Sequence, residues 1–465
     1  MSETISHRQL TPESEDAFGI DAAFVADIET HLRADNRERV RELVADLHYA
    51  DMADLLERLD GQDRRLLVEV IRDEFPADVL PELPGQVRDD VMEALGFEDF
   101  ATALTELDSD DAVYVASKLS AEERAQVAAR MPQASRMLIE QGLAHAEHSA
   151  GRLMQREFVA VPNYWSVGET IDYMRAAHNM PEKFYAVFVV DPRHRPQGVV
   201  ELSRLLRSKR PERMKDLIDQ DIEPVPLDMD REDVAFLFKQ RNLVTVPVVD
   251  KSGRLVGQIT IDDIVDVIEE EAEEDILKLA GVSNTQVSSL YNAIIRTANS
   301  RFPWLAINLL TAYLASAVVG IYEDSIEKLA ALAVLMPIVA GMGGNAGTQT
   351  LATAVRALAT RELNASNALR ITSKELFVGM INGLLFAAIV GVSTYLWFDD
   401  IFLALTIAAA MFINLTAAGF SGIVIPLIID RAGGDPAASG GVLLTTVTDV
   451  VGFFSFLGLA GIIVL

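Results

Sequence analysis

Residues 437–465 read AASGGVLLTTVTDVVGFFSFLGLAGIIVL, and Asp449 is the one charged side chain among them. A helix needs about 20 mostly apolar residues to cross a hydrocarbon core of about 30 Å. Helices in the core of a water-soluble protein rarely run this long without more charges. The stretch therefore predicts a helix that spans a membrane.

Four further stretches of comparable length precede it, and none of them contains Asp, Glu, Lys or Arg. With residues 437–465 they predict a five-helix, all-α transmembrane domain over residues 301–465. These stretches are residues 302–322, 329–355, 376–398 and 401–429.

Apart from Lys328, the basic residues in and just before this region fall on one side of the predicted membrane, which the positive-inside rule assigns to the cytoplasm. A multi-pass protein of the cell (plasma) membrane is expected, with its N-terminus in the cytoplasm and its C-terminus outside, as an odd number of spans requires. The basic residues in question are Arg296, Arg301, Arg356, Arg361, Arg370, Lys374 and Arg431.

The charge is divided unevenly along the chain, whose formal net charge is −29. Residues 301–465 hold only seven of the 40 basic and ten of the 69 acidic side chains. The first 300 residues are therefore strongly acidic, which suits cations as partners and argues against nucleic acid or anionic lipid. Adaptation to a salty environment is an alternative cause of this acidity. The first residues do not have the pattern of a signal peptide, and the absence of cysteine excludes disulfides.

Asp449 lies near the middle of its predicted span. A carboxylate inside a membrane is costly unless it faces protein, water or a cation, so its default interpretation is functional. We expect a cation site there. A neutral, hydrogen-bonded acid in the packing and a proton-relay carboxylate are the alternatives.

The segment PIVAGMGGNAGTQ (337–349) interrupts the second span with a proline and four glycines. We expect it to loosen or break the helix and to free backbone carbonyls for a pathway. Asn345 and Gln349 lie four residues apart, on one helical face, and are the candidate pore-lining residues here. Close helix packing through small residues is the alternative interpretation of the glycines.

Residues 150–268 contain an internal repeat, in which the segments VVD (189–191) and VVD (248–250) are each followed by a glycine at the same spacing. Each copy predicts a strand, a helix over residues 167–177 or 231–241, a strand pair around an Asp turn, and a second helix. This tandem α/β module, divided at residues 150–210 and 211–261, resembles a pair of cystathionine-β-synthase (CBS) domains. The resemblance implies dimerisation and leaves ATP binding open.

Two further segments complete the predicted organisation. Residues 20–145 show apolar residues at helical spacing, interrupted by Pro76, Pro81, Pro84 and Gly96, which indicates an α-helical N-terminal superhelical domain. Residues 262–300 begin with nine acids among fourteen residues and predict an acidic connecting helix and linker. Because like charges repel along a helix, divalent cations, which prefer oxygen ligands, could bridge it to other acidic surfaces. A solvated linker face is the alternative.

With this order in view, the chain resembles the MgtE family of magnesium channels and transporters over nearly its whole length. The specific parts are the segment 337–349 and the pair DPA (435–437) and TTVTD (445–449). The resemblance implies a homodimer with one central Mg2+ pathway, which the connecting ("plug") helix closes when cytoplasmic Mg2+ is abundant.

The resemblance also assigns residues. It implies that Asp449 is the pore ligand and that transported and regulatory Mg2+ are the bound ions. Thr445, one turn from Asp449, is a further pore-lining candidate, because its oxygens could contribute to selectivity for a hydrated ion. The regulatory ligands that it implies are Asp263, Asp266, Glu271, Glu274 and Asp275, with Asp110 and Asp111 as facing carboxylates of the N-terminal domain.

Two other functions stay open at this point. One is a proton-coupled divalent-cation transporter in which Asp449 titrates, and the other is a nucleotide-sensing CBS membrane protein without transport. An enzyme is not expected, because no nucleophile, base and acid occur together in a recognisable pattern. The glycines at 341–347 lie inside a span, not in a phosphate-binding loop that precedes a helix.

Overall fold

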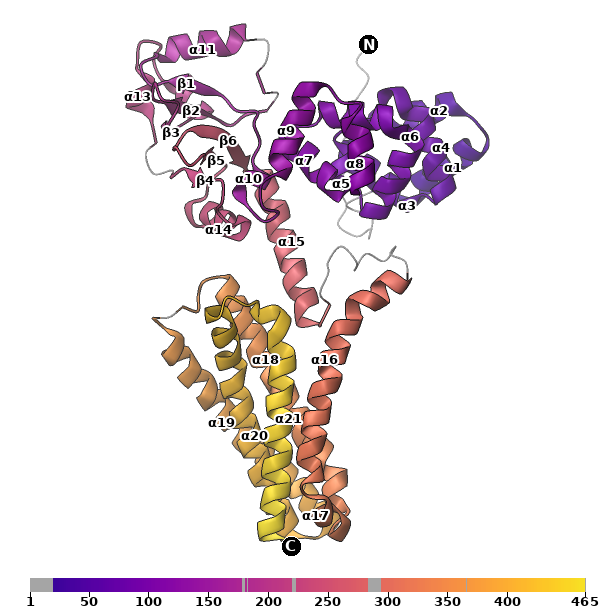
Figure 1. Cartoon of the computed structure of the whole chain (residues 1–465), viewed down its shortest axis with the longest axis vertical. Helices are drawn as coiled ribbons and strands as arrows, with labels where there is room; N and C mark the ends of the chain where they lie inside the picture. The colour runs from indigo at the N-terminus through magenta and orange to yellow at the C-terminus, as the bar shows by residue number, and fades with distance from the viewer. Residues whose placement is uncertain are drawn as a thin grey trace. The chain divides into compact units, whose positions relative to one another are not determined.

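The computed structural model describes residues 20–177, 180–181, 183–219, 223–282, 294–364 and 366–464 (Figure 1). The chain divides into two compact units, Met1–Glu269 and Glu270–Leu465. Residues 283–293 of the predicted linker, and the C-terminal Leu465, lie outside the described residues.

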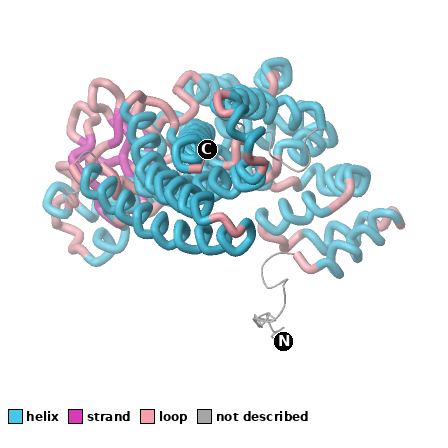
Figure 2. Tube along the Cα trace, turned by 90° about the horizontal axis from the view of Figure 1, so that it is seen from below, coloured by secondary structure: helices cyan, strands magenta, loops and turns pink. Residues whose placement is uncertain are grey.

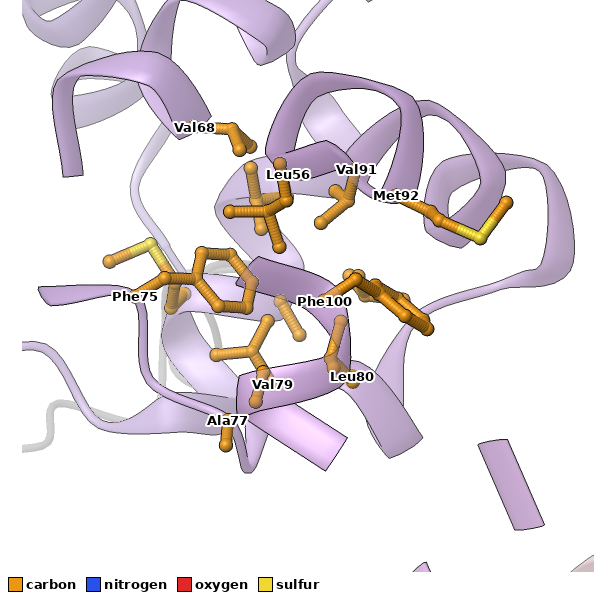
Figure 3. Packing of buried hydrophobic residues seen from close by; sticks show 14 of the residues in the cluster. Leu56, Val68, Phe75, Ala77, Val79, Leu80, Val91, Met92 and Phe100 are labelled. Carbon is orange, nitrogen blue, oxygen red and sulfur yellow. The ribbon is translucent and has the colours of Figure 1, made fainter. Parts of the chain in front are cut away.

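The first unit begins with a domain built only of helices. Its core gathers apolar side chains from successive helices, among them Leu56, Val68, Val91 and Phe100 (Figure 3). The helices are α1 (Ala22–Arg33), α2 (Arg37–Val44), α3 (Tyr49–Arg58), α4 (Gly61–Ile71), η1 (Arg72–Glu74), α5 (Val79–Glu82), α6 (Gly85–Glu106), α7 (Ser109–Lys118), α8 (Ala121–Ala128), α9 (Gln133–Leu143) and α10 (Ala150–Leu153).

The predicted helix breaks are confirmed at three of four positions. Pro76 and Pro84 lie between helices, and Gly96 bends α6 with a φ of 76°, a conformation that favours glycine. Pro81 does not break a helix, because it lies in the first turn of α5, where a proline removes no hydrogen bond.

A repeating arginine contact marks a structural repeat that the sequence did not reveal, although its spacing along the chain is not constant. Arg64, Arg88 and Arg124 are each the fourth residue of an even-numbered helix, α4, α6 or α8. Each donates from Nη2 to the carbonyl oxygen five residues earlier, on the residue that ends the preceding helix. The domain therefore contains three helical hairpins, α3–α4, α5–α6 and α7–α8, with the same closing hydrogen bond.

The second part of the first unit is the predicted tandem α/β module. Its two three-stranded sheets have the same topology, with a parallel first pair of strands and an antiparallel second pair. Asp191 and Asp250 each accept two backbone hydrogen bonds in the turn between the last two strands, as the repeat predicts. The elements are β1 (Ala160–Pro162), α11 (Val167–Ala176), β2 (Ala186–Val190), β3 (Pro196–Glu201), α12 (Leu202–Arg207), α13 (Met214–Leu217), β4 (Val225–Pro226), α14 (Arg231–Arg241), β5 (Thr245–Val249) and β6 (Leu255–Thr260).

The acidic segment forms the predicted helix, α15 (Ile261–Leu279). Ile264 and Val267 are buried in the core of the second sheet, which explains why the helix forms despite its repelling charges. Packing of an apolar face is the main source of helix stability in proteins. From Glu270 onward the helix belongs to the second unit.

The second unit is a helical bundle, and five of its helices are long and apolar enough to cross a membrane, as the sequence predicts. Figure 2 shows the strands gathered in one part of the chain, with helices and the loops that join them elsewhere. The bundle helices are α16 (Ile294–Gly320), α17 (Glu323–Lys328), α18 (Ala331–Ala359), α19 (Ala368–Phe398), α20 (Ile401–Arg431) and α21 (Pro436–Ile463).

The prediction that the second span is broken is wrong. Helix α18 runs without interruption through Pro337 and the glycines that follow it. Two of these glycines instead allow close contact between helices: Gly343 packs against Asn414 of α20, and Gly347 packs against Leu444 of α21. Gly341 and Gly344 meet open space, so packing, the alternative interpretation, accounts for two of the four glycines.

Candidate cation sites

Helices α18 and α21 pack side by side and run in opposite directions, and they carry the candidate pore residues. Gly440 meets Leu351 and Gly347 meets Leu444, so advancing along one helix means going back along the other. This pairing brings Asn345 of α18 and Thr445 of α21 to similar heights in the bundle. The short side chains at these contacts let the two helices approach closely.

The four candidate pore residues of these two helices reach the surface of the bundle. Asn345, Gln349 and Thr445 are exposed, and Asp449 is half-buried, although all four lie inside membrane-spanning helices. Polar residues in such helices almost always face the interior of a bundle or a water-filled path. A lipid-facing surface of this composition would be costly.

The threonine hydroxyls next to Asp449 are oriented by their own helix. Thr445 Oγ1 donates to the carbonyl of Gly441 and Thr446 Oγ1 donates to that of Val442, both at 2.7 Å. A hydroxyl has one proton to donate and two lone pairs that accept. The exposed Thr445 therefore presents an acceptor to its surroundings, as Asp449 does.

The second candidate site lies in the first unit, where Asp110 and Asp111 of α7 approach Asp263 of α15. Burial, followed by the charges of Asp263 and Asp111, raises the pKa of Asp110 well above its usual range. Burial first, and neighbouring carboxylates second, raise the pKa of Asp111 and of Asp263 to about 7. The three carboxylates thus repel one another at neutral pH, a repulsion that a cation would relieve.

Sequence reasoning missed several acidic neighbours of this cluster. Asp108 and Asp78 contribute to the raised pKa of Asp111, and Asp262 contributes to that of Asp263. Glu157 accepts a hydrogen bond from the hydroxyl of Ser109 at 2.7 Å. Asp78 and Glu157 are far from the predicted ligands in sequence, so no local pattern marks them, whereas Asp108 and Asp262 are close neighbours of Asp110 and Asp263 along the chain.

The other acidic residues of α15 that were predicted as regulatory ligands follow Asp263 along the helix. Asp266 is exposed, Glu271 is half-buried, and Glu274 pairs with Lys278 of the same helix. Lys278 also contacts Asp435, which caps the start of α21, at 2.6 Å. Burial, and then the charge of Asp435, raise the pKa of Asp275. Across the described part of the chain, no three acidic or histidine side chains converge as they would around a bound metal.

One further polar residue of the bundle was not predicted. Asn414 is the only amide in the apolar run of α20, and its side chain is fully buried. Its Nδ2 donates to the carbonyl of Val339 in α18 at 2.8 Å. The signal that could have revealed it was the same one that drew attention to Asp449, a polar side chain inside a span.

Three families match successive parts of the chain. The MgtE intracellular N domain matches residues 47–148, the CBS domain matches residues 150–210 and 214–270, and MgtE, described as a divalent cation transporter, matches residues 336–459. The chain is thus a multi-pass membrane protein of the divalent cation transporter class, with CBS domains in its first unit.

Curated relatives identify the family more closely. The magnesium transporter MgtE of Enterococcus faecalis is 31% identical over 322 residues, which cover 69% of this chain and 70% of that one. The MgtE of Thermus thermophilus is 29% identical and the alignment covers 92% of this chain and 96% of its relative. The chain belongs to the MgtE family.

Among solved structures, the chain is similar to the cytosolic domain of the Mg2+ channel MgtE in complex with ATP. The identity is 27% and the TM-score 0.49, and the match covers 52% of this chain and 99% of that one.

Proposed function

We propose that this protein transports Mg2+ across a cell membrane through a pathway that two copies of the chain form around Asp449. The observation that carries the proposal is the polar surface of α18 and α21, where Asn345, Gln349 and Thr445 are exposed inside spans. A second copy related by two-fold symmetry would cover this surface and bring two copies of Asp449 together. The relatives named above are magnesium transporters, which supports the choice of ion.

The chemistry of the surface suits a hydrated ion. Mg2+ loses its water reluctantly and is usually held by one or two carboxylates with several waters retained. Those waters donate hydrogen bonds outward, so the pathway needs acceptors. Asp449 and the back-bonded hydroxyl of Thr445 supply them. In this proposal Asp449 binds the hydrated ion, and the amides of Asn345 and Gln349 extend the path toward the cytoplasm.

We further propose that cytoplasmic Mg2+ regulates the pathway through the acidic residues of the first unit and of α15. Binding of the ion near Asp110, Asp111 and Asp263 would relieve their mutual repulsion and favour their approach. The regulatory set also includes Asp266, Glu271, Glu274 and Asp275. The end of α15 lies against the start of α21 through Lys278 and Asp435. Helix α15 is therefore suited to transmit the change to a helix that carries Asp449.

Two parts of the proposal concern the setting of the protein. The basic residues that flank the spans favour a cytoplasmic first unit and an outside C-terminus in the cell membrane. The CBS pair is a candidate site for ATP, since CBS domains in general bind adenine nucleotides. Titration of ATP into the full-length protein in detergent, followed by calorimetry, tests that part independently of transport.

Flux through purified protein in proteoliposomes tests the pore. Asp449→Asn keeps the size of the side chain and removes its charge. Because a charged ligand supplies much of the binding energy for an ion, Mg2+ uptake should fall by at least about tenfold. The matched control is Asp399→Asn, the same change in the left-handed residue that ends α19, a conformation that Asn tolerates. Unchanged Mg2+ uptake in Asp449→Asn would overturn the pore assignment.

Neutralisation of the regulatory residues tests the gating. A variant with Asp263, Asp266, Glu271 and Glu274 changed to the corresponding amides should keep conducting at high internal Mg2+, where the wild type closes. Persisting closure would show that the sensor lies elsewhere. A pH gradient that drives uptake would instead favour proton coupling at Asp449.

A further inference from the structure

Asn414 joins three helices of the bundle at one point. Its Nδ2 donates to the carbonyl of Val339 in α18, and its Oδ1 is buried with no donor among the described residues. Gly343 of α18 and Gly452 of α21 both face the same amide. Burying an amide in a membrane is costly, and such residues are rarely kept there without a role.

The two glycines are required by the amide. A Cβ added at Gly343 would overlap the side chain of Asn414, lying 2.8 Å from its Cγ, and one added at Gly452 would lie 2.8 Å from its Nδ2. The amide cannot swing away freely, because its hydrogen bond to Val339 fixes it. The spacing between α18, α20 and α21 is therefore set at this junction by one side chain.

The junction lies next to the proposed pathway. Gly452 is one helical turn from Asp449 and on the same face of α21, and Gly343 is two residues from Asn345, which puts Asn345 on the other side of α18. A change in the size of residue 414 would move both helices that carry the pathway.

We propose that Asn414 is a positioning residue that sets the distance of Asp449 and Asn345 from the axis of the pathway, and thereby its discrimination between hydrated cations. This inference rests on the proposed function, since it concerns the same pathway. Asn414 does not touch the ion. It acts by holding α18 and α21 at one spacing.

Transport measurements test the inference first. Because a misplacement of about 1 Å can cost a preorganised site about a hundredfold, we expect Asn414→Ala to lower Mg2+ flux about tenfold and the ratio of Mg2+ to Ca2+ flux about threefold. The matched control is Thr406→Val on the same helix, since Thr406 is equally buried but donates only to its own helix, at Phe402. A purely structural role would lower both fluxes equally, and an unchanged flux ratio would overturn the inference.

Size compensation supplies a second variant. Gly343→Ala should abolish most Mg2+ flux, and adding Asn414→Ala should restore it to the level of Asn414→Ala alone. Gly452→Ala is a milder change at the same junction and should also lower the flux ratio, so the test does not depend on the folding of Asn414→Ala. If Gly343→Ala lost as much Mg2+ flux in combination with Asn414→Ala as it does alone, the inference would be overturned.

A cross-link makes the test independent of transport. The chain has no cysteine of its own, and a Cβ at Gly347 lies 3.1 Å from Cγ of Leu444. The pair Gly347→Cys and Leu444→Cys should therefore form a disulfide that reports the spacing of α18 and α21, and Asn414→Ala should slow its formation at least about threefold because such bonds need a narrow Cβ separation. A rate of disulfide formation that Asn414→Ala leaves unchanged would overturn the inference, whether or not the wild type transports Mg2+. Absence of Mg2+ transport in the wild type would instead refute only the proposed function.

Discussion

The contact between Lys278 and Asp435 gives the most direct test of how α15 acts on the bundle. Lys278 is 23% exposed and Asp435 is 38% exposed, and they lie 2.6 Å apart. Partial burial lowers the pKa of Lys278, but hydrogen bonds to Asp435 and Glu274 outweigh it and raise that pKa above its ordinary value. The ammonium group is therefore charged at every physiological pH.

The magnitude follows from the exposure of the pair. Exposed ion pairs stabilise a structure by about 0.2–1 kcal/mol, and this half-buried one belongs near the upper end of that range. Lys278→Met also leaves Asp275 and Asp435 facing each other without a cation, and the charge of Asp435 already raises the pKa of Asp275. A loss of about 1 kcal/mol corresponds to about a fivefold change in an equilibrium between a docked and an undocked α15.

The assay is residual Mg2+ flux in proteoliposomes that contain saturating Mg2+ on the cytoplasmic side. Lys278→Met should raise this flux about fivefold, and the difference should shrink at 1 M salt, which screens the pair. Lys251→Met, in an exposed turn of the α/β module, is the control. Asp435→Asn keeps a capping side chain at α21 and should add little when combined with Lys278→Met. A residual flux that Lys278→Met leaves unchanged, at low and high salt, would refute the reasoning.

Three other expectations concern the first unit. The folded-state pKa of Asp263 is raised to about 7, so the metal-free protein should lose stability as pH rises from about 4 to about 7. Addition of Mg2+ at pH 8 should restore that stability. In a chelator, the melting temperature of Asp263→Asn should depend less on pH than that of the wild type. Arg64 is buried and forms hydrogen bonds with Asp90 and two carbonyls, so Arg64→Met should destabilise the helical domain by about 3 kcal/mol. Arg65→Met breaks only an exposed ion pair with Glu93 and should cost less than about 1 kcal/mol. Equal shifts in denaturant midpoint for the two variants would contradict this expectation. A Cβ at Gly198 would lie 2.6 Å from the carbonyl oxygen of Asp219, so Gly198→Ala should lower the melting temperature of the α/β module by several degrees. No such shift is expected for Gly85→Ala, because a Cβ at Gly85 would meet open space.

The sequence was sufficient for features that depend on local composition. Five apolar runs became five helices, and the repeated VVD segments became two sheets of identical topology. Both patterns survive because a membrane and a sheet core each select side chains by simple periodicity. The acidic helix followed from the apolar stripe within it.

The failures have a common physical cause, which is that a partner distant in sequence decides the outcome. The glycines from 341 to 347 were expected to break α18, but the helix is continuous, and Asn414 and Leu444 pack against two of them, Gly343 and Gly347. Asp78 and Glu157 join the cluster around Asp110 and Asp111 only through the fold of the first unit. Neither contact leaves a mark on the local sequence.

The three arginines of the helical domain have a consequence for how such a domain can change its length. Arg64, Arg88 and Arg124 each satisfy a carbonyl at the turn of their own hairpin, so no turn relies on another hairpin for this hydrogen bond. A hairpin could therefore be inserted or deleted during evolution without leaving this turn carbonyl unpaired. The length of this domain can thus change by whole hairpins while each remaining hairpin keeps its structure.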